Sequence, residues 1–156
     1  MHDLVLKGGR VIDPAQSIDR VTDVAFADGK VAAIGDGLEG RDTRDCSGKI
    51  VTPGLIDLHT HVYAGHTSIG IEPDPYALAT ACTTLVDAGT AGPANFDGYR
   101  RHIVEPADVN IVSYINISFA VFFSLSKTVM VGESDDFRLL HSESCLEAIN
   151  RHRDMI

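Results

Sequence analysis

Tryptophan is absent from this 156-residue sequence, and cysteine is scarce. The three cysteines, Cys46, Cys82 and Cys145, are odd in number and form no Cys-x-x-Cys pair. This pattern argues against a disulfide framework and against a thiolate zinc site, and it favours a reducing compartment. Long hydrophobic runs are also missing, because the most apolar stretch, 115–125, is far shorter than the roughly 20 residues that span a bilayer. We therefore expect a cytoplasmic protein without a membrane partner.

Basic residues are few as well. The chain has 13 lysines and arginines against 22 acidic residues, and its formal net charge is -9. Nucleic-acid binding depends on cations that neutralise phosphates, so no nucleic-acid partner is expected. The hydrophobic fraction of 44% is typical of a globular domain or of part of a larger one.

The first third of the chain is typical of short β-strands. The strongest signal is Asp28-Gly29, which lies between the apolar runs 24–26 and 31–34 and predicts a type I′ hairpin. Residues 36–48 are polar and rich in glycine, which is typical of a connection. We expect residues 1–52 to form a small antiparallel β unit that has too few strands to close a core alone.

After the Pro53-Gly54 turn, strands and helices are expected to alternate. Apolar strands are predicted at 55–59, 83–89 and 109–119. The first of these reads as buried on both faces, as in a parallel sheet. The alternation predicts a parallel α/β architecture over residues 53–156.

Helices are predicted between and after these strands. The first is expected to be capped by Asp74, with Pro75 at its first position. A second is bounded by Pro93 and Pro106, and a third begins near the capping candidates Ser142 and Ser144.

The segment VTPGLIDLHTH places two histidines one residue apart at the end of the first α/β strand. Alternate residues on a strand share a face, so Asp57, His59 and His61 point the same way. Two imidazoles about 7 Å apart can converge on one divalent cation, such as zinc, iron or manganese. Asp57 could orient one of them by accepting its other N–H.

A bare His-x-His is a weak signal, and two partly buried histidines satisfied by the backbone are the alternative. The context favours metal binding, because sites in α/β folds are built at the carboxyl ends of strands. Three other residues lie where they could meet a substrate. Tyr63 and His66 follow the strand in its loop, and Asp87 ends the next strand. Loop packing or turn capping are the alternatives for these three.

With the preceding hairpin-rich segment, VTPGLIDLHTH resembles the N-terminus of the amidohydrolase superfamily. The sequence HVYAGHTSIGIEPDPYALATACTTLVDAGTAGPANFDGYRR is similar to the dihydroorotase-like amidohydrolase and deacetylase group. The resemblance implies the N-terminal part of a TIM-like (β/α)₈ metallohydrolase barrel, preceded by part of a small β-sandwich domain. It places the sandwich part at 1–52 and the first three βα units of an incomplete barrel at 53–156.

The family's metal site implies that His59 and His61 hold a divalent metal, zinc first, with one or two ions in the intact enzyme. Its bridging carboxylated lysine, two further histidines and catalytic aspartate match no position in this sequence, so no catalytic residue is assigned. Ala81 stands where relatives often have glycine, and a positive φ there would cost about 1 kcal/mol.

The resemblance predicts a metal-dependent hydrolase of N-acyl, O-acyl or cyclic amide bonds in small molecules, and a homo-oligomer when intact. Because a (β/α)₈ barrel takes about 250 residues, this chain is expected to be an incomplete N-terminal portion that is inactive alone. The alternative is a catalytically inactive truncated remnant or assembly fragment.

Overall fold

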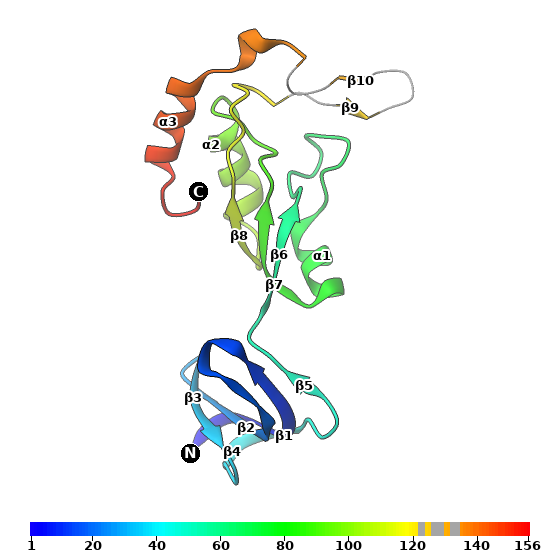
Figure 1. Ribbon diagram of the computed structural model, residues 1–156, viewed down its shortest axis with the longest axis vertical. Coiled ribbons are helices and arrows are strands. Elements are labelled where there is room, and N and C mark those ends of the chain that lie inside the picture. Colours follow the sequence, from blue (N-terminus) through cyan, green and yellow to red (C-terminus); the bar gives the residue numbers. More distant parts are fainter. Residues whose placement is uncertain (122–123, 126–129, 132–134) are drawn as a thin grey trace. The chain divides into compact units, whose positions relative to one another are not determined.

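A computed structural model describes residues 1–121, 124–125, 130–131 and 135–156. The chain divides into two compact units, Met1–Pro53 and Gly54–Ile156 (Figure 1). The N-terminal unit contains β1 (His2–Asp13), η1 (Pro14–Gln16), β2 (Ile18–Ala27), β3 (Lys30–Gly35), β4 (Gly40–Asp45) and β5 (Ile50–Val51). The C-terminal unit contains β6 (Leu55–Thr60), α1 (Pro73–Thr80), β7 (Cys82–Asp87), α2 (Phe96–Tyr99), η2 (Arg100–Val104), β8 (Asn110–Ser113), β9 (Ser124–Leu125), β10 (Met130–Val131), η3 (Phe137–Leu139) and α3 (Ser142–Arg151).

The N-terminal unit is one sheet with the strand order β3-β2-β1-β4, and β5 also pairs with β1. The predicted hairpin is confirmed, because Asp28 and Gly29 both have positive φ, 52° and 71°, between the antiparallel strands β2 and β3. The sheet is mixed rather than antiparallel, since β4 and β5 run parallel to β1. The expectation of a plain connection over 36–48 was wrong, because β4 lies within it. Strand β4 consists mainly of exposed charged residues, so it has no alternation of hydrophobic and polar residues from which a strand could be predicted.

The C-terminal unit carries the parallel sheet β6-β7-β8. Helix α1 connects β6 to β7, and α2 with the π-helical turn η2 connects β7 to β8 (Figure 1). The predicted parallel α/β alternation is therefore confirmed. Its core gathers side chains from β7 and β8, from α1 and α2, from the loops after β6 and β7 and from the C-terminal segment: Val62, Ala77, Leu85, Ala91, Phe96, Tyr99, Ile111 and Met155. No helix in the described part of the chain is long and apolar enough to span a bilayer.

Two helix starts differ from the prediction. Helix α1 begins at Pro73, and Asp74 makes no cap for it. Instead, Asp74 Oδ1 accepts hydrogen bonds from the backbone N–H groups of Asp108 and Val109, at 3.0 and 2.9 Å. Helix α3 is capped by His141, whose Nδ1 accepts from the N–H of Ser144 at 3.2 Å.

Ala81 ends α1 in the left-handed conformation, with φ 57° and ψ 25°. The positive φ whose cost was considered from the sequence is thus present at this alanine. The predicted third strand is shorter than expected, since β8 ends at Ser113. Beyond it the backbone N–H of Tyr114 still donates to Asp87, but Asn116 donates to Ala91 in the preceding loop and leaves the ladder.

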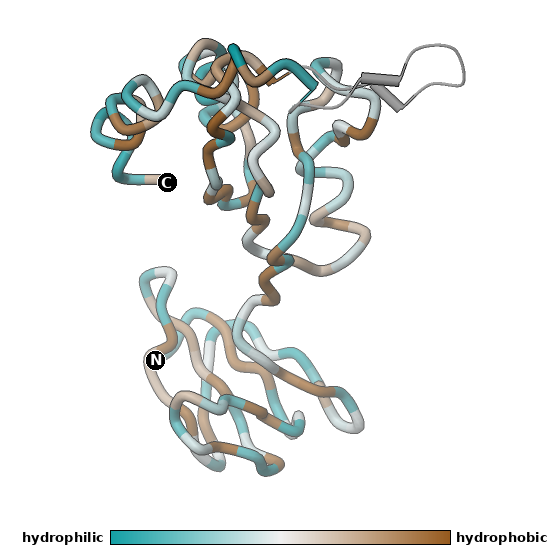
Figure 2. The backbone as a smooth tube through the Cα atoms, turned by 45° about the horizontal axis from the view of Figure 1, so that its top comes forward, coloured by the Kyte–Doolittle hydropathy of each residue, from teal (hydrophilic) through white to brown (hydrophobic). Residues whose placement is uncertain are grey.

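Strand β6 is not buried on both faces as predicted. It is one of the two outer strands of the sheet, and Ile56 and Leu58 are 57% and 73% exposed. Hydrophobic residues, brown in Figure 2, recur along the backbone of both units. Within the described residues no strand pairs with the outer edge of β6, and nothing covers the side chains of Ile56 and Leu58.

Candidate metal centre

The two histidines lie at the carboxyl end of β6, where the strand passes into its loop. Thr60 between them turns to the other face, where it is buried and donates a 2.9 Å hydrogen bond to the carbonyl oxygen of Val86. His59 is exposed and His61 is half-buried. Their ring centroids are 5.3 Å apart at an interplanar angle of 76°. Two imidazoles on one face at this separation are suited to contribute two nitrogen ligands to one cation.

The ring of His61 is held by the loop that follows β7. Its Nδ1 lies 3.0 Å from Thr90 Oγ1, and Thr90 Oγ1 donates a 2.8 Å hydrogen bond to Asp87 Oδ2. Thr90 is not among the site residues predicted from the sequence. The spacing Asp87-x-x-Thr90 is the signal that could have found it, because a carboxylate that accepts hydrogen bonds from residues two and three positions later is typical of a tight turn.

Asp87 is fully buried and accepts four hydrogen bonds from its own chain. Oδ1 accepts from the N–H groups of Gly89 and Thr90, at 3.0 and 2.7 Å. Oδ2 accepts from the Thr90 hydroxyl and from the N–H of Val62, at 2.8 and 2.9 Å. The carboxylate thus joins the ends of β6 and β7, and it can act on a substrate only through the groups that it positions.

Asp57 also differs from the role expected of it. Its Oδ1 accepts from the backbone N–H of His59 at 3.1 Å, and its Oδ2 accepts from the Tyr76 hydroxyl at 2.7 Å. The Tyr76 hydrogen bond, and after it the His59 N–H, hold the pKa of the Asp57 carboxyl below its usual value. Asp57 therefore positions the main chain of His59 and links β6 to α1, whereas the prediction had it accept an imidazole N–H.

Tyr63 and His66 pack on each other in the loop after β6. Their rings are stacked with centroids 4.4 Å apart, and Tyr63 also lies against the buried ring of Tyr99 at 5.1 Å. His66 Nε2 lies 2.9 Å from Asn95 Nδ2 and 3.2 Å from the carbonyl oxygen of Val121. Partial burial raises the pKa of Tyr63. Both side chains serve loop packing, and their contact with a substrate remains a prediction.

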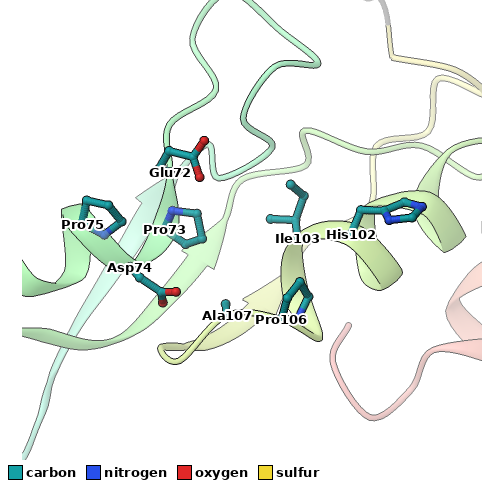
Figure 3. A pocket seen from close by; sticks show the side chains of 8 residues that line it. All are labelled: Glu72, Pro73, Asp74, Pro75, His102, Ile103, Pro106 and Ala107. Atoms are coloured by element: carbon teal, nitrogen blue, oxygen red, sulfur yellow. The ribbon is translucent and has the colours of Figure 1, made fainter.

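A surface hollow lies elsewhere on the unit, between the start of α1 and the turn before β8 (Figure 3). Its lining residues are Glu72, Pro73, Asp74, Pro75, His102, Ile103, Pro106 and Ala107. The carboxylate of Asp74 is engaged with the backbone at the start of β8. None of the predicted site residues lines the hollow, and it lies by the amino end of β8, whereas chemistry is expected at the carboxyl ends of the strands.

The residues that could hold a metal therefore form a partial set. In the described ranges no group of three or more His, Cys, Asp or Glu side chains comes together. His59 and His61 fit a zinc ion as two of its ligands, because zinc accepts neutral imidazole nitrogen and takes four ligands in all.

Comparisons with known proteins show that the chain is similar in sequence to the N-terminal part of enzymes named as hydrolases. No model of a known protein family matches it. It is 35% identical over 135 residues to the deacetylase Atu3266 of Agrobacterium fabrum, which covers 84% of the chain. The chain spans about a third of the length of that relative, 33%.

Solved structures give the same fold. The crystal structure of a dihydroorotase superposes on the whole chain with a TM-score of 0.79 and 29% identity, over 41% of the dihydroorotase chain. An N-acyl-D-glutamate deacylase from Bordetella bronchiseptica, solved with zinc and a phosphonate inhibitor, covers 78% of the chain with a TM-score of 0.54. The chain covers 31% of that deacylase, and their 23% identity supports only the fold. The fold is thus the N-terminal part of a TIM-like barrel with a preceding β unit.

Proposed function

Because this chain belongs to the amidohydrolase superfamily and matches the N-terminal part of its deacetylases and dihydroorotases, we propose that it supplies the first metal-binding strand of a metal-dependent hydrolase. The single observation that carries the proposal is the convergence of His59 and His61 at the carboxyl end of β6. In barrel enzymes this is the end at which active sites are built.

His59 and His61 would hold a divalent ion, and zinc is the ion we propose. When bound, such an ion activates water and polarises the carbonyl of the bond to be cleaved. The chain's own contribution is to aim the two imidazoles. Asp57 fixes the backbone of His59 at 3.1 Å, and the loop after β7 holds the ring of His61.

The proposed substrates are small molecules with an N-acyl, O-acyl or cyclic amide bond. Support comes from the activities named for the similar proteins, a deacetylase and a dihydroorotase. Tyr63 and His66 lie in the loop that leaves the candidate metal strand, so we propose them as the part of this chain that reaches a substrate. Asp87 would act indirectly, by holding the loops after β6 and β7 through its hydrogen bonds to Val62, Gly89 and Thr90.

A cytoplasmic location is part of the proposal. All three cysteines are free thiols in the structure, which a reducing compartment preserves. For the intact enzyme we propose a homo-oligomer.

Zinc titration of the chain by isothermal calorimetry tests the metal site. We expect His59→Gln and His61→Gln each to weaken zinc binding at least about 10-fold, because each removes one of few ligands. His102→Gln, at the rim of the hollow, is the matched control and should bind as the wild type does. Unchanged zinc affinity in both site variants would exclude the proposed site.

Activity can be tested in a chimera in which this chain replaces the matching third of the Agrobacterium deacetylase. We expect the folded chimera to hydrolyse the deacetylase's substrates with zinc, and the His61→Gln chimera to be inactive. A folded, zinc-loaded chimera without activity would favour the second candidate below.

The second candidate is a non-catalytic assembly fragment. The observation that favours it is the exposed apolar surface of β6, with Ile56 and Leu58 on the outer strand. Such an edge is a template for another strand. Tight association with a second polypeptide, together with an inactive chimera, would support this candidate over the hydrolase.

A further inference from the structure

We propose that Thr90 is a positioning residue that fixes the tautomer of His61, so that the Nε2 lone pair is the one presented to a metal. The role of this tautomer in metal binding rests on the proposed function. The structural content of the inference stands on three groups: the buried carboxylate of Asp87, the buried hydroxyl of Thr90 and the half-buried ring of His61.

The hydrogen-bonded chain Asp87–Thr90–His61 is called the relay below. Which group donates in each of its hydrogen bonds follows from counting protons. The hydroxyl of Thr90 has one proton and lies 2.8 Å from Asp87 Oδ2 and 3.0 Å from His61 Nδ1. A carboxylate only accepts, so the Thr90 proton must be given to Asp87. If it were given to His61 instead, two oxygen atoms would face each other at 2.8 Å without a proton between them.

Thr90 Oγ1 can then only accept from His61, which requires a proton on Nδ1. A neutral imidazole carries one N–H, so its lone pair is on Nε2. Zinc binds the unprotonated nitrogen, and a hydrogen bond from the other nitrogen fixes the ring and raises its basicity. The relay therefore selects which nitrogen of His61 is a ligand atom.

Burial strengthens this assignment. Asp87 and Thr90 are both 0% exposed, so water does not compete for the hydroxyl. The same carboxylate accepts from the N–H of Val62, the residue after His61, at 2.9 Å. Asp87 thus holds the main chain beside His61 directly and the ring through Thr90. Gly89, at φ 85°, allows the tight turn that brings Thr90 back to Asp87.

The test is a long-range ¹H–¹⁵N NMR spectrum of the metal-free chain with labelled histidine, near pH 8, where imidazoles are mostly neutral. His61→Gln identifies the His61 resonances. We expect the wild-type ring to carry its proton on Nδ1. Thr90→Val, which keeps the shape and removes the hydroxyl, should shift His61 to a mixture with substantial Nε2–H. Thr90→Ser should retain the wild-type tautomer.

Thr22→Val is the matched control, because Thr22 is also buried and also donates to an aspartate, Asp36 Oδ1 at 2.8 Å, in the N-terminal unit. It should leave the His61 spectrum unchanged. A wild-type His61 protonated on Nε2 would overturn the proposal. So would a folded Thr90→Val chain with the wild-type tautomer, or a Thr90→Ser chain that has lost it.

Zinc affinity separates this inference from the proposed function. If both hold, Thr90→Val weakens zinc binding about 10-fold and Thr90→Ser restores most of it. If the wild-type chain binds no zinc yet shows the expected tautomer response, the metal function fails and the relay stands. If zinc binds at His59 and His61 but the tautomer is wrong, the relay alone fails.

Discussion

The hydroxyl of Tyr76 donates a 2.7 Å hydrogen bond to Asp57, two residues before His59 on the candidate metal strand. The contact joins α1 to β6, elements that are linked in sequence by the whole loop after the strand. The geometry of the site therefore depends on the helix that follows it as well as on the strand itself.

Tyr76→Phe should raise the pKa of Asp57 toward its ordinary value of 3.8, because the hydrogen bond that lowers it most is removed. A carboxyl with a lowered pKa in the folded state contributes stability above its unfolded pKa and loses it as pH falls through the folded pKa. The variant should thus lose part of this contribution at neutral pH. Carboxyl NMR titration of the metal-free chain measures the pKa, and the exposed Tyr114→Phe is the control. An unchanged Asp57 midpoint would contradict the contact.

Ala81→Gly should stabilise the chain by about 1 kcal/mol, because glycine adopts positive φ without the strain of a Cβ. Ala81 has φ 57° at the end of α1. Ala79→Gly, at an exposed position inside the same helix, should instead destabilise by about 1 kcal/mol. Urea unfolding of the two variants gives opposite signs if the left-handed cap is correct, and the same sign if it is not.

Asp97→Ala should destabilise the C-terminal unit by about 1–2 kcal/mol, because it leaves a buried group without its partner. His152 is 5% exposed, and its Nε2 lies 2.8 Å from Asp97 Oδ1. Asp42→Ala breaks an exposed ion pair with Arg44 and should change stability by no more than about 0.5 kcal/mol. Hydrogen exchange of the α3 amides should rise only in the first variant, and equal effects of both would contradict the role of the buried pair.

Replacing Ile56 and Leu58 together by lysine should reduce self-association, because charged side chains protect an outer strand from edge pairing. These side chains are 57% and 73% exposed, so the free energy of unfolding should change by no more than about 0.5 kcal/mol. Leu78→Lys on α1, at 87% exposure, is the control away from the sheet edge. Sedimentation velocity that finds the same association in all three chains would rule out β6 as the contact surface.

Local signals predicted those parts of the fold that local chemistry determines. Asp28-Gly29 gave the hairpin, and Pro93 and Pro106 bounded the second helix, because positive φ and proline geometry act within a few residues. The start of α1 was predicted at Pro75 rather than Pro73 because Asp74 bonds to residues 34 and 35 positions away, a contact that no local pattern contains.

In the candidate site, too, local patterns predicted some features and missed those that depend on contacts between distant residues. Alternation on a strand placed His59 and His61 on one face. The partners that hold them, Tyr76 for Asp57 and Thr90 for His61, come from other elements. The Asp87-x-x-Thr90 turn was visible in the sequence, but its position against His61 depends on the pairing of β6 with β7.

The double hydrogen bond that Asp74 accepts from Asp108 and Val109 has a consequence for the order in which the C-terminal unit opens. Those two amides lose this hydrogen bond when the first turn of α1 moves away from the chain that enters β8. We therefore expect detachment of the helix to promote fraying of β8, and β7, which lies between β6 and β8, should be the last strand of the sheet to lose protection.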